Sequence, residues 1–190
     1  MSDSGWQAGF VELLLRWNER INLVSKGDLH RVAERHIQDS LQLVPLIPSS
    51  VDRGIDVGSG AGFPGLILAK ATGLAFDLIE SDQRKVAFLR EAARAIAAPV
   101  TVHSVRIEVA QVLPAPLVTA RALAPLPRLL SLAAPLLSPN GLCLFHKGAG
   151  YERELTDSNT QWHMHVERFP SRTARGAAIL RITELHRVPT

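Results

Sequence analysis

Apolar residues in the first third of the chain recur with the period of an α-helix. One stripe of a first helix is formed by Phe10, Leu13, Leu14, Trp17 and Ile21. A second amphipathic segment covers residues 30–44 and ends at Pro45 and Pro48, because proline does not continue a helix. These patterns predict an N-terminal helical extension over residues 1–50.

After residue 50, short apolar runs alternate with helical segments. Strands are predicted at residues 54–57, 75–79, 100–102, 117–120 and 141–145, and helices at 64–71, 84–96 and 126–134. This alternation favours a mostly parallel sheet with helices on both faces. Two more strands, at 163–169 and 178–186, have no predicted helix between them, and we expect them to close the sheet as an antiparallel pair. The predicted fold is therefore α/β with seven strands, in one compact domain whose main part is residues 51–190.

The composition is that of an ordinary globular protein, with 46% of the 190 residues hydrophobic and 21% charged. Because Cys143 is the only cysteine, an intrachain disulfide and a Cys-rich zinc site are both excluded, and we expect no metal.

No apolar stretch is long enough to cross a bilayer, and residues 1–4 lack the pattern of a signal peptide. We therefore expect a cytoplasmic protein without a membrane partner. The net charge of +3 permits a nucleic-acid partner without requiring one.

A glycine-rich turn follows the strand at residues 54–57. Asp56 precedes it, and the turn itself contains Gly58, Gly60 and Gly62. Glycines let a backbone turn tightly and approach a ligand closely, and open α/β sheets bind ligands at the carboxyl ends of their strands. Glu80 ends the next strand, where a carboxylate accepts hydrogen bonds from ribose hydroxyls. The turn therefore predicts a cofactor site.

Two classes of cofactor compete for this turn. Residues 60–65 match the GxGxxG fingerprint of dinucleotide-binding proteins, but in those proteins the first glycine directly follows the strand, and here that residue is Gly58. An acidic residue followed by Gly-x-Gly-x-Gly is the methyltransferase form, and Asp56 with its three glycines fits it. We therefore expect S-adenosylmethionine. A nicotinamide-dependent oxidoreductase and a turn without a ligand are the alternatives.

Short motifs along nearly the whole chain resemble the RsmG (GidB) family of small-subunit rRNA methyltransferases. They are Trp17-Asn18, Ile21-Asn22-Leu23-Val24, Arg35-His36, Asp39-Ser40, residues 56–65 with Phe63-Pro64-Gly65, Leu78-Ile79-Glu80-Ser81 with Lys85, Phe88 and Leu89, Arg106-Ile107-Glu108, Ala120-Arg121-Ala122 and Lys147-Gly148. Each motif is a weak signal, whereas their order and spacing together are specific. One departure is Ala115-Pro116-Leu117, where the family usually carries an aspartate, and the tail after Gly150 matches only loosely.

The resemblance implies a Rossmann-like class I methyltransferase fold and transfer of a methyl group to N7 of a guanine in 16S rRNA. The partner would be 16S rRNA or the 30S subunit, and we expect a monomer. The cofactor-binding residues implied are Asp56, Gly58, Gly60, Phe63, Glu80, Ser81, Ile107, Glu108 and Arg121. The candidate catalytic residues are Arg121, Lys147 and Arg106. A small-molecule methyltransferase and a non-catalytic ribosome-associated binding protein are further alternatives.

The chemistry of guanine N7 limits what the site must contain. N7 has a free lone pair and no proton, so the nucleophile needs no general base, and positioning of the two reactants supplies most of the rate. Arginine often binds guanine through both N7 and O6, but here N7 must stay free to attack. We therefore assign Arg121, Arg106 and Lys147 to O6, to phosphate or to the carboxylate of the cofactor. An unpaired base could stack on Phe63 or on another exposed ring.

Several of these residues also have a purely structural interpretation. Arg35 and Asp39 are four apart and would form a helix-surface pair, with His36 in a packing role. Lys147 would be a surface lysine, and Arg106 and Glu108 would face solvent. Two cationic groups would be solvated surfaces or phosphate-binding sites. One comprises Arg84, Lys85, Arg90 and Arg94, and the other comprises Arg168, Arg172, Arg175, Arg181 and Arg187.

Overall fold

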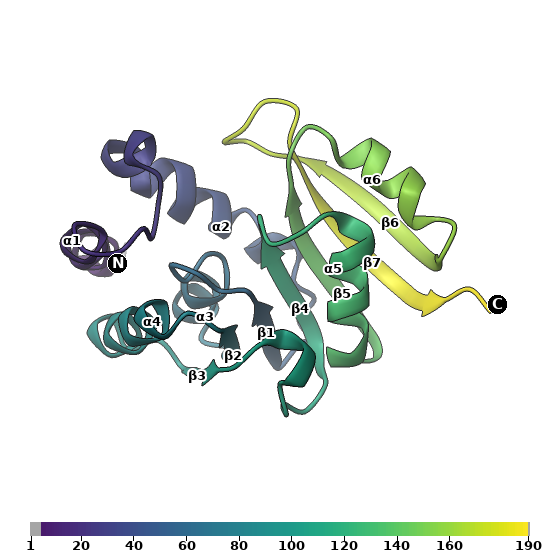
Figure 1. The fold of residues 1–190 in the computed structure, drawn as a ribbon, viewed down its shortest axis with the longest axis horizontal. Helices are drawn as coiled ribbons and strands as arrows, with labels where there is room; N and C mark the ends of the chain where they lie inside the picture. The colour runs from purple at the N-terminus through teal and green to yellow at the C-terminus, as the bar shows by residue number, and fades with distance from the viewer. Residues whose placement is uncertain (1–4, 190) are drawn as a thin grey trace.

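The computed structural model describes residues 5–189 (Figure 1). Residues 1–4, on which the signal-peptide expectation rests, lie outside this part. Seven strands form one sheet in the order β3-β2-β1-β4-β5-β7-β6. The strands are β1 (Arg53–Val57), β2 (Ala75–Glu80), β3 (Val100–Ser104), β4 (Ala115–Arg121), β5 (Leu137–Lys147), β6 (Trp162–Pro170) and β7 (Ala178–Arg187). The first five are paired in parallel, and β7 lies antiparallel between β5 and β6, so the predicted mixed sheet is confirmed.

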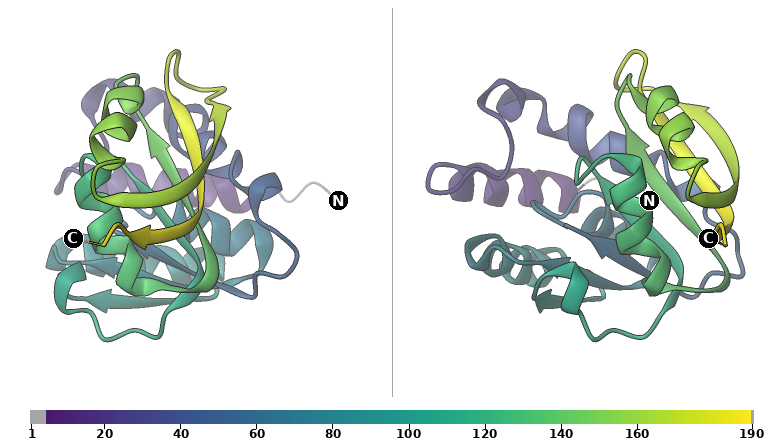
Figure 2. Two further views of the ribbon diagram at one scale, coloured as in Figure 1. Left: turned by 90° about the vertical axis from the view of Figure 1, so that its right-hand side faces the viewer. Right: turned by 45° about the vertical axis from the view of Figure 1, so that its right-hand side comes forward.

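Helices cover both faces of the sheet (Figure 2). The α-helices are α1 (Gly5–Asn18), α2 (Asp39–Leu41), α3 (Gly65–Thr72), α4 (Gln83–Ile96), α5 (Leu126–Ala133) and α6 (Tyr151–Ser158). In β5, Leu142 and Leu144 pack into the same core as α1, α3 and α4, whereas Cys143 and Phe145 pack into the core that contains α5 and α6. This division follows from the alternation of strand side chains between the two faces of a sheet. Burial raises the pKa of the Cys143 thiol above its usual range, as expected for a structural cysteine.

The second N-terminal helix is the element that differs most from its prediction. Instead of one helix over residues 30–44, the chain forms a 3-10 helix η1 (Lys26–Arg31), a π-helical segment η2 (Ala33–Gln38), the short α2 and a 3-10 turn η3 (Val44–Leu46). The Ser40 hydroxyl donates to the carbonyl oxygen of His36 at 2.7 Å, a local bond that competes with regular helix geometry. Asp39 and Ser40 are both buried in this segment, although each is polar.

Helix α6 has no counterpart among the predicted elements. Its sequence, YERELTDS, is almost entirely polar, and only Leu155 and Ser158 are buried. A helix with so little apolar surface gives no periodic signal. Three short 3-10 turns complete the chain between the larger elements: η3, η4 (Ile107–Val109) and η5 (Ala134–Leu136).

The N-terminal extension packs on the same core as the sheet. Phe88 of α4 lies between two aromatic rings of α1, with ring centroids 6.2 Å from Phe10 and 5.9 Å from Trp17. The indole N–H of Trp17 also donates to Glu91 at 3.1 Å. These contacts join the extension to the core of the sheet, while the expectation of one compact domain with a division at residue 50 stays a prediction.

We expect Phe88→Ala to lower the free energy of unfolding by about 3–5 kcal/mol, because it leaves a cavity between α1 and α4. Urea unfolding followed by tryptophan fluorescence and by circular dichroism measures this loss and tests whether both probes report one transition. Leu113→Ala is the control, because Leu113 is 78% exposed and its loss should change stability by only about 0.5 kcal/mol or less. A Phe88 variant as stable as the wild type would contradict this account of the core.

Candidate active site

The glycine-rich turn after β1 has the backbone conformation that its glycines predict. Gly58, Gly60 and Gly62 have φ values of +67°, +55° and +88°, in the left-handed region that favours glycine. At Gly58 a Cβ atom would also lie 2.5 Å from Cδ1 of Leu123, in the segment after β4. The backbone N–H groups of Gly58 and Ser59 both donate to the carbonyl oxygen of Ile79. The turn is therefore fixed against the end of β2.

Glu80, at the carboxyl end of β2, holds the same turn through its side chain. Its Oε2 accepts a hydrogen bond from the Gly60 N–H at 2.9 Å, and its Oε1 accepts one from the Asp82 N–H at 2.8 Å. The residue is 9% exposed, and it lines the cavity above the sheet. Each carboxylate oxygen keeps a further lone pair, so Glu80 can accept from a ligand hydroxyl while it organises the turn.

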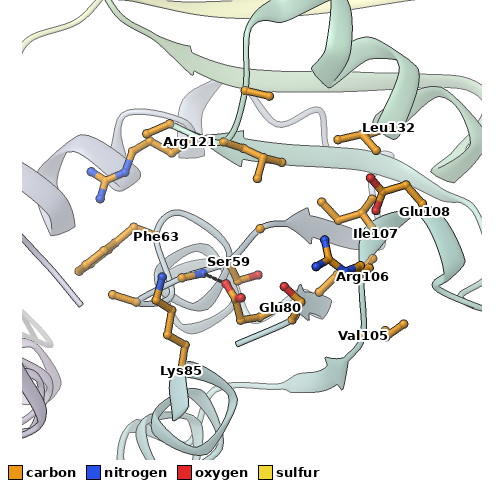
Figure 3. A pocket seen from close by; sticks show the side chains of 18 of the residues that line it. Ser59, Phe63, Glu80, Lys85, Val105, Arg106, Ile107, Glu108, Arg121 and Leu132 are labelled. Atoms are coloured by element: carbon orange, nitrogen blue, oxygen red, sulfur yellow. Dashed lines mark hydrogen bonds between the residues drawn. The ribbon is translucent and has the colours of Figure 1, made fainter. Parts of the chain in front are cut away.

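A cavity of about 550 Å³ opens at the carboxyl ends of the parallel strands (Figure 3). Its volume suits a nucleoside-sized ligand. Eight of the nine predicted cofactor-binding residues line it: Gly58, Gly60, Phe63, Glu80, Ser81, Ile107, Glu108 and Arg121. Arg106, a candidate catalytic residue, lines it as well. The structure therefore brings together residues from the ends of β1, β2, β3 and β4.

Asp56 is the predicted cofactor residue that does not line the cavity. It is completely buried below the turn, where its Oδ1 accepts a hydrogen bond from the Thr119 hydroxyl at 2.6 Å. Burial raises the pKa of Asp56 to about 6, and the Thr119 bond opposes that rise. A Cβ atom at Gly65, where α3 begins, would lie 2.3 Å from the Cβ of Asp56. Asp56 thus supports the junction between β1 and α3 rather than facing a ligand.

Lys147 also lies outside the cavity. Its Nζ contacts Glu154 Oε2 at 2.6 Å and donates to the carbonyl oxygen of Ala124 at 2.9 Å. The same Oε2 of Glu154 accepts from the backbone N–H of Leu126 at 2.6 Å. Lys147 is 9% exposed, so it is neither a surface lysine nor a residue open to substrate. It fixes the segment that connects Arg121 to α5, and Ala124 of that segment lines the cavity.

Arg121 reaches from β4 toward the N-terminal extension. Its Nη1 contacts Asp39 Oδ2 at 3.3 Å and the carbonyl oxygen of Arg35 at 3.3 Å. The expected pair between Arg35 and Asp39 is not formed; Arg35 lies 3.6 Å from Asp28 instead. Asp39 directly follows the π-helical segment η2, and it pairs with Arg121 of β4 rather than with Arg35.

Asp39 is the centre of a buried polar cluster. Its carboxylate accepts hydrogen bonds from Gln42, Arg121 and the Thr173 hydroxyl, and its carbonyl oxygen contacts the ring of His146 at 3.0 Å. Burial acts to raise the pKa of Asp39, but the positive charges near it and the bond from Thr173 outweigh burial and lower that pKa. Asp39 is therefore ionised at neutral pH. Sequence reasoning missed this role, because its partners come from distant parts of the chain.

Phe63 has little free surface for stacking. It is 4% exposed, its ring packs edge-on against Phe10 with centroids 5.7 Å apart, and His36 stacks on it at 5.0 Å. The guanidinium of Arg121 lies 4.9 Å from its centroid. The suggestion that a target base stacks on Phe63 is therefore wrong for this structure. The ring instead joins the cofactor turn to the N-terminal extension.

At the other end of the cavity, Glu108 in η4 pairs with Arg128 of α5 at 2.5 Å. Both side chains are about half exposed, so this contact is a surface pair at the cavity mouth. Ile107 and Leu132 lie near each other in the same region (Figure 3). Arg128 and Leu132 were not among the predicted site residues; they come from α5, where no motif marked them.

The departure from the family pattern lies away from this cavity. Pro116 is near the start of β4, whereas Arg121 is at the end of that strand. The pairing of β4 with β5 changes register between Ala115 and Leu117. The substituted segment therefore lies at the amino ends of the parallel strands, whereas the site lies at their carboxyl ends.

Residues 5–189 contain neither a metal cluster nor a membrane-spanning helix. No group of three or more His, Cys, Asp or Glu side chains there is placed to hold a metal ion. Within the same residues, no helix is long and apolar enough to cross a membrane.

The strand order and the position of the cavity define a class I S-adenosylmethionine-dependent methyltransferase fold. The structure is similar to that of a putative O-methyltransferase from Klebsiella pneumoniae, with a TM-score of 0.64 and 11% identity over 96% of this chain and 91% of the other. It is also similar to the N-methyltransferase NodS from Bradyrhizobium japonicum in complex with S-adenosyl-L-homocysteine, with a TM-score of 0.61 and 16% identity over 93% and 98% of the two chains. Such low identities show the fold alone.

Sequence comparison gives the family. The model of the GidB family, rRNA small subunit methyltransferase G, matches residues 7–178. The ribosomal RNA small subunit methyltransferase G of Granulibacter bethesdensis is 55% identical over 179 residues, which are 94% of this chain and 84% of the relative. The protein belongs to the GidB family of rRNA small subunit methyltransferases G, and the resemblance drawn from the sequence motifs is confirmed.

His36 gives this site a pH-dependent stability. In residues 5–189, neither ring nitrogen of His36 has a hydrogen-bond partner, and burial lowers its pKa from 6.5 to about 4. Between these values the unfolded chain binds a proton that the folded chain does not, so stability falls as pH falls from 6.5 towards 4.

We expect His36→Phe to keep the ring contact with Phe63 and to make this fall in stability shallower. Urea unfolding of both proteins at about pH 7 and about pH 5 measures the two falls, and the difference between them reports the proton at His36, because the other titrating groups, Asp56 among them, are common to both. His30→Phe, at an exposed position, is the matched control for the change of residue type. An equally steep pH dependence in wild type and His36→Phe would contradict the assignment.

Proposed function

We propose that this protein transfers a methyl group from S-adenosylmethionine to N7 of a guanine in 16S rRNA. Its substrate is 16S rRNA, either free or in the 30S subunit, and it acts as a monomer in the cytoplasm. The observation that carries the proposal is the cavity where the glycine-rich turn, Glu80 and Arg121 meet. Family membership over residues 7–178 favours rRNA over a small molecule as substrate and a methyl donor over a nicotinamide cofactor.

The residues that line the cavity fit the parts of S-adenosylmethionine. Glu80 holds the ribose, because its carboxylate is at the end of β2 and keeps free lone pairs. Ile107 and Leu132 give the adenine an apolar surface. The turn leaves space for the rest of the cofactor at Gly60, where an added Cβ atom would meet only the Gly58 carbonyl oxygen, at 3.8 Å.

Bound S-adenosylmethionine supplies a methyl group on a sulfonium, and transfer to N7 leaves the bonding electrons on sulfur. The protein contributes position, because N7 has no proton to remove. Arg121 is held at the edge of the cavity by Asp39 through one of its nitrogens. Its remaining N–H groups are available for guanine O6 or a phosphate, which leaves N7 free. Asp56 and Lys147 act as positioning residues for the cofactor turn and for the segment after Arg121.

The proposal is tested by incubating the purified protein with labelled S-adenosylmethionine and either 30S subunits or protein-free 16S rRNA. We expect one methyl group per rRNA, recovered as 7-methylguanosine after nuclease digestion and mass spectrometry. No incorporation into either substrate, or a different product base, would contradict it. Comparison of the two substrates identifies which form of the rRNA is used.

Arg121→Ala should lower turnover by about 100-fold or more while rRNA binding is largely kept, as for the loss of a donor aimed at the reacting groups. Single-turnover methylation and filter binding separate the two effects. Arg128→Ala is the matched control: Arg128 also lines the cavity, but its side chain is 58% exposed and paired with Glu108. Full turnover by Arg121→Ala would remove Arg121 from the catalytic machinery.

Glu80→Gln should weaken S-adenosylmethionine binding by about 10-fold, because a hydrogen bond to a charged group contributes about 1.5–3 kcal/mol. Titration calorimetry measures the dissociation constant. Glu108→Gln serves as control, since this carboxylate is 46% exposed and faces Arg128, and it should have a smaller effect. Unchanged affinity of Glu80→Gln would rule out Glu80 as the ribose ligand.

A further inference from the structure

The structure separates the tail arginines into paired and unpaired side chains. Arg181 forms an ion pair with Glu167, and Arg168 lies 3.7 Å from Glu152. Arg187 lies over the ring of Trp162, 5.1 Å from its centroid. Arg172 and Arg175 are exposed, and neither side chain has an ion-pair partner or a hydrogen bond within residues 5–189. Within the described residues, Arg172 and Arg175 are therefore the tail arginines with neither a carboxylate nor an aromatic ring against the guanidinium.

Both of these arginines lie in the loop between β6 and β7, which is at the same edge of the sheet as the cavity. Ala178, the first residue of β7, pairs with Pro170 at the end of β6 and with Lys147 at the end of β5. The carboxyl end of β5 belongs to the edge where the parallel strands present the cofactor site. In Figure 1 the loop extends from the top of β6 and β7 toward the N-terminal extension.

Hydrogen bonds to the N-terminal extension hold this loop in place. Arg35 Nη1 donates to the Thr173 carbonyl oxygen at 2.8 Å, and the Arg172 backbone N–H donates to Gln42 at 2.7 Å. Thr173 and Arg121 bind the two oxygens of one Asp39 carboxylate, so the loop adjoins the candidate catalytic arginine. Because the loop backbone is already ordered, binding through it costs little additional conformational entropy.

We propose that Arg172 and Arg175 bind backbone phosphates of the rRNA beside the target guanine and so position that base next to Arg121. This inference rests on the proposed function. Arginine suits the role because its planar guanidinium binds phosphate through two parallel hydrogen bonds. Phosphate contacts of this kind fix orientation and register and carry no base specificity.

The cationic group on α4 is the rival phosphate site, and its geometry is less suitable. Helix α4 begins beside Glu80 and runs away from the carboxyl edge toward β3. Only Lys85, near its start, lines the cavity. Arg90 and Arg94 are in its second half, beside Val100 at the beginning of β3. Arg90 and Arg94 therefore lie toward the amino ends of the parallel strands, away from the cavity.

The test compares two double variants. The loop variant is Arg172→Gln/Arg175→Gln, and the α4 variant, Arg90→Gln/Arg94→Gln, is the control that removes the same charge from α4. Neither pair changes a side chain placed in the cofactor site, and the Arg172 backbone bond to Gln42 is kept. Binding of protein-free 16S rRNA and of 30S subunits is measured across a series of salt concentrations. Methylation kinetics on the same rRNA and calorimetry with S-adenosylmethionine complete the comparison.

The loop variant should bind rRNA about 10-fold more weakly. The slope of log K against log salt concentration should become shallower by about 1.4, because two phosphate contacts are lost. Its kcat/KM for rRNA should fall while the S-adenosylmethionine affinity stays near wild type. The α4 variant should match the wild type. Equal losses in both variants, a loss in the α4 variant alone, or no loss in the loop variant would each overturn the inference.

These outcomes are distinct from a failure of the proposed function. If the wild type methylates rRNA and the loop variant binds normally, the phosphate site is wrong and the function stands. If the wild type does not methylate rRNA but the loop variant loses affinity and salt dependence, the function is wrong and the phosphate site stands. A wild type that binds neither protein-free 16S rRNA nor 30S subunits overturns both.

Discussion

The ion pair between Asp39 and Arg121 joins the three parts of the chain on which the site depends. Asp39 comes from the N-terminal extension and Arg121 from the end of β4, and Thr173 of the β6–β7 loop shares the same carboxylate. A buried charge is costly unless it is paired and hydrogen-bonded, so each partner becomes necessary to the others. The extension is thereby part of the active-site structure rather than an appendage to the sheet.

Contacts between protein side chains and backbone hold most of the cofactor-binding part of the site in place. Glu80 fixes the glycine-rich turn through backbone N–H groups, and Phe63 fastens that turn to α1 and to His36. Lys147 does the same for the segment after Arg121 by binding the Ala124 carbonyl. Such pre-organisation suits a reaction whose rate depends on the placement of two reactants rather than on proton transfer.

The sheet and the cofactor turn could be predicted from the sequence because both leave local signals. Strands and helices have their own periods, and parallel strands bring their carboxyl ends to one edge, so Gly58 and Glu80 were placed correctly at that edge. Helix α6 was missed because it is almost entirely polar. The partner of Asp39 was also missed, since it is 82 positions away and no periodicity connects residues that meet only through the fold.

The contact between Asp56 and Gly65 has a consequence for how sequences of this fold can vary. The first residue of α3 has no room for even a methyl group, because that group would occupy the place of the Asp56 side chain. The residues at positions 56 and 65 therefore share one limited space, so a larger residue at 65 requires a smaller one at 56. A side chain added at residue 65 alone should therefore shift the start of α3 away from β1.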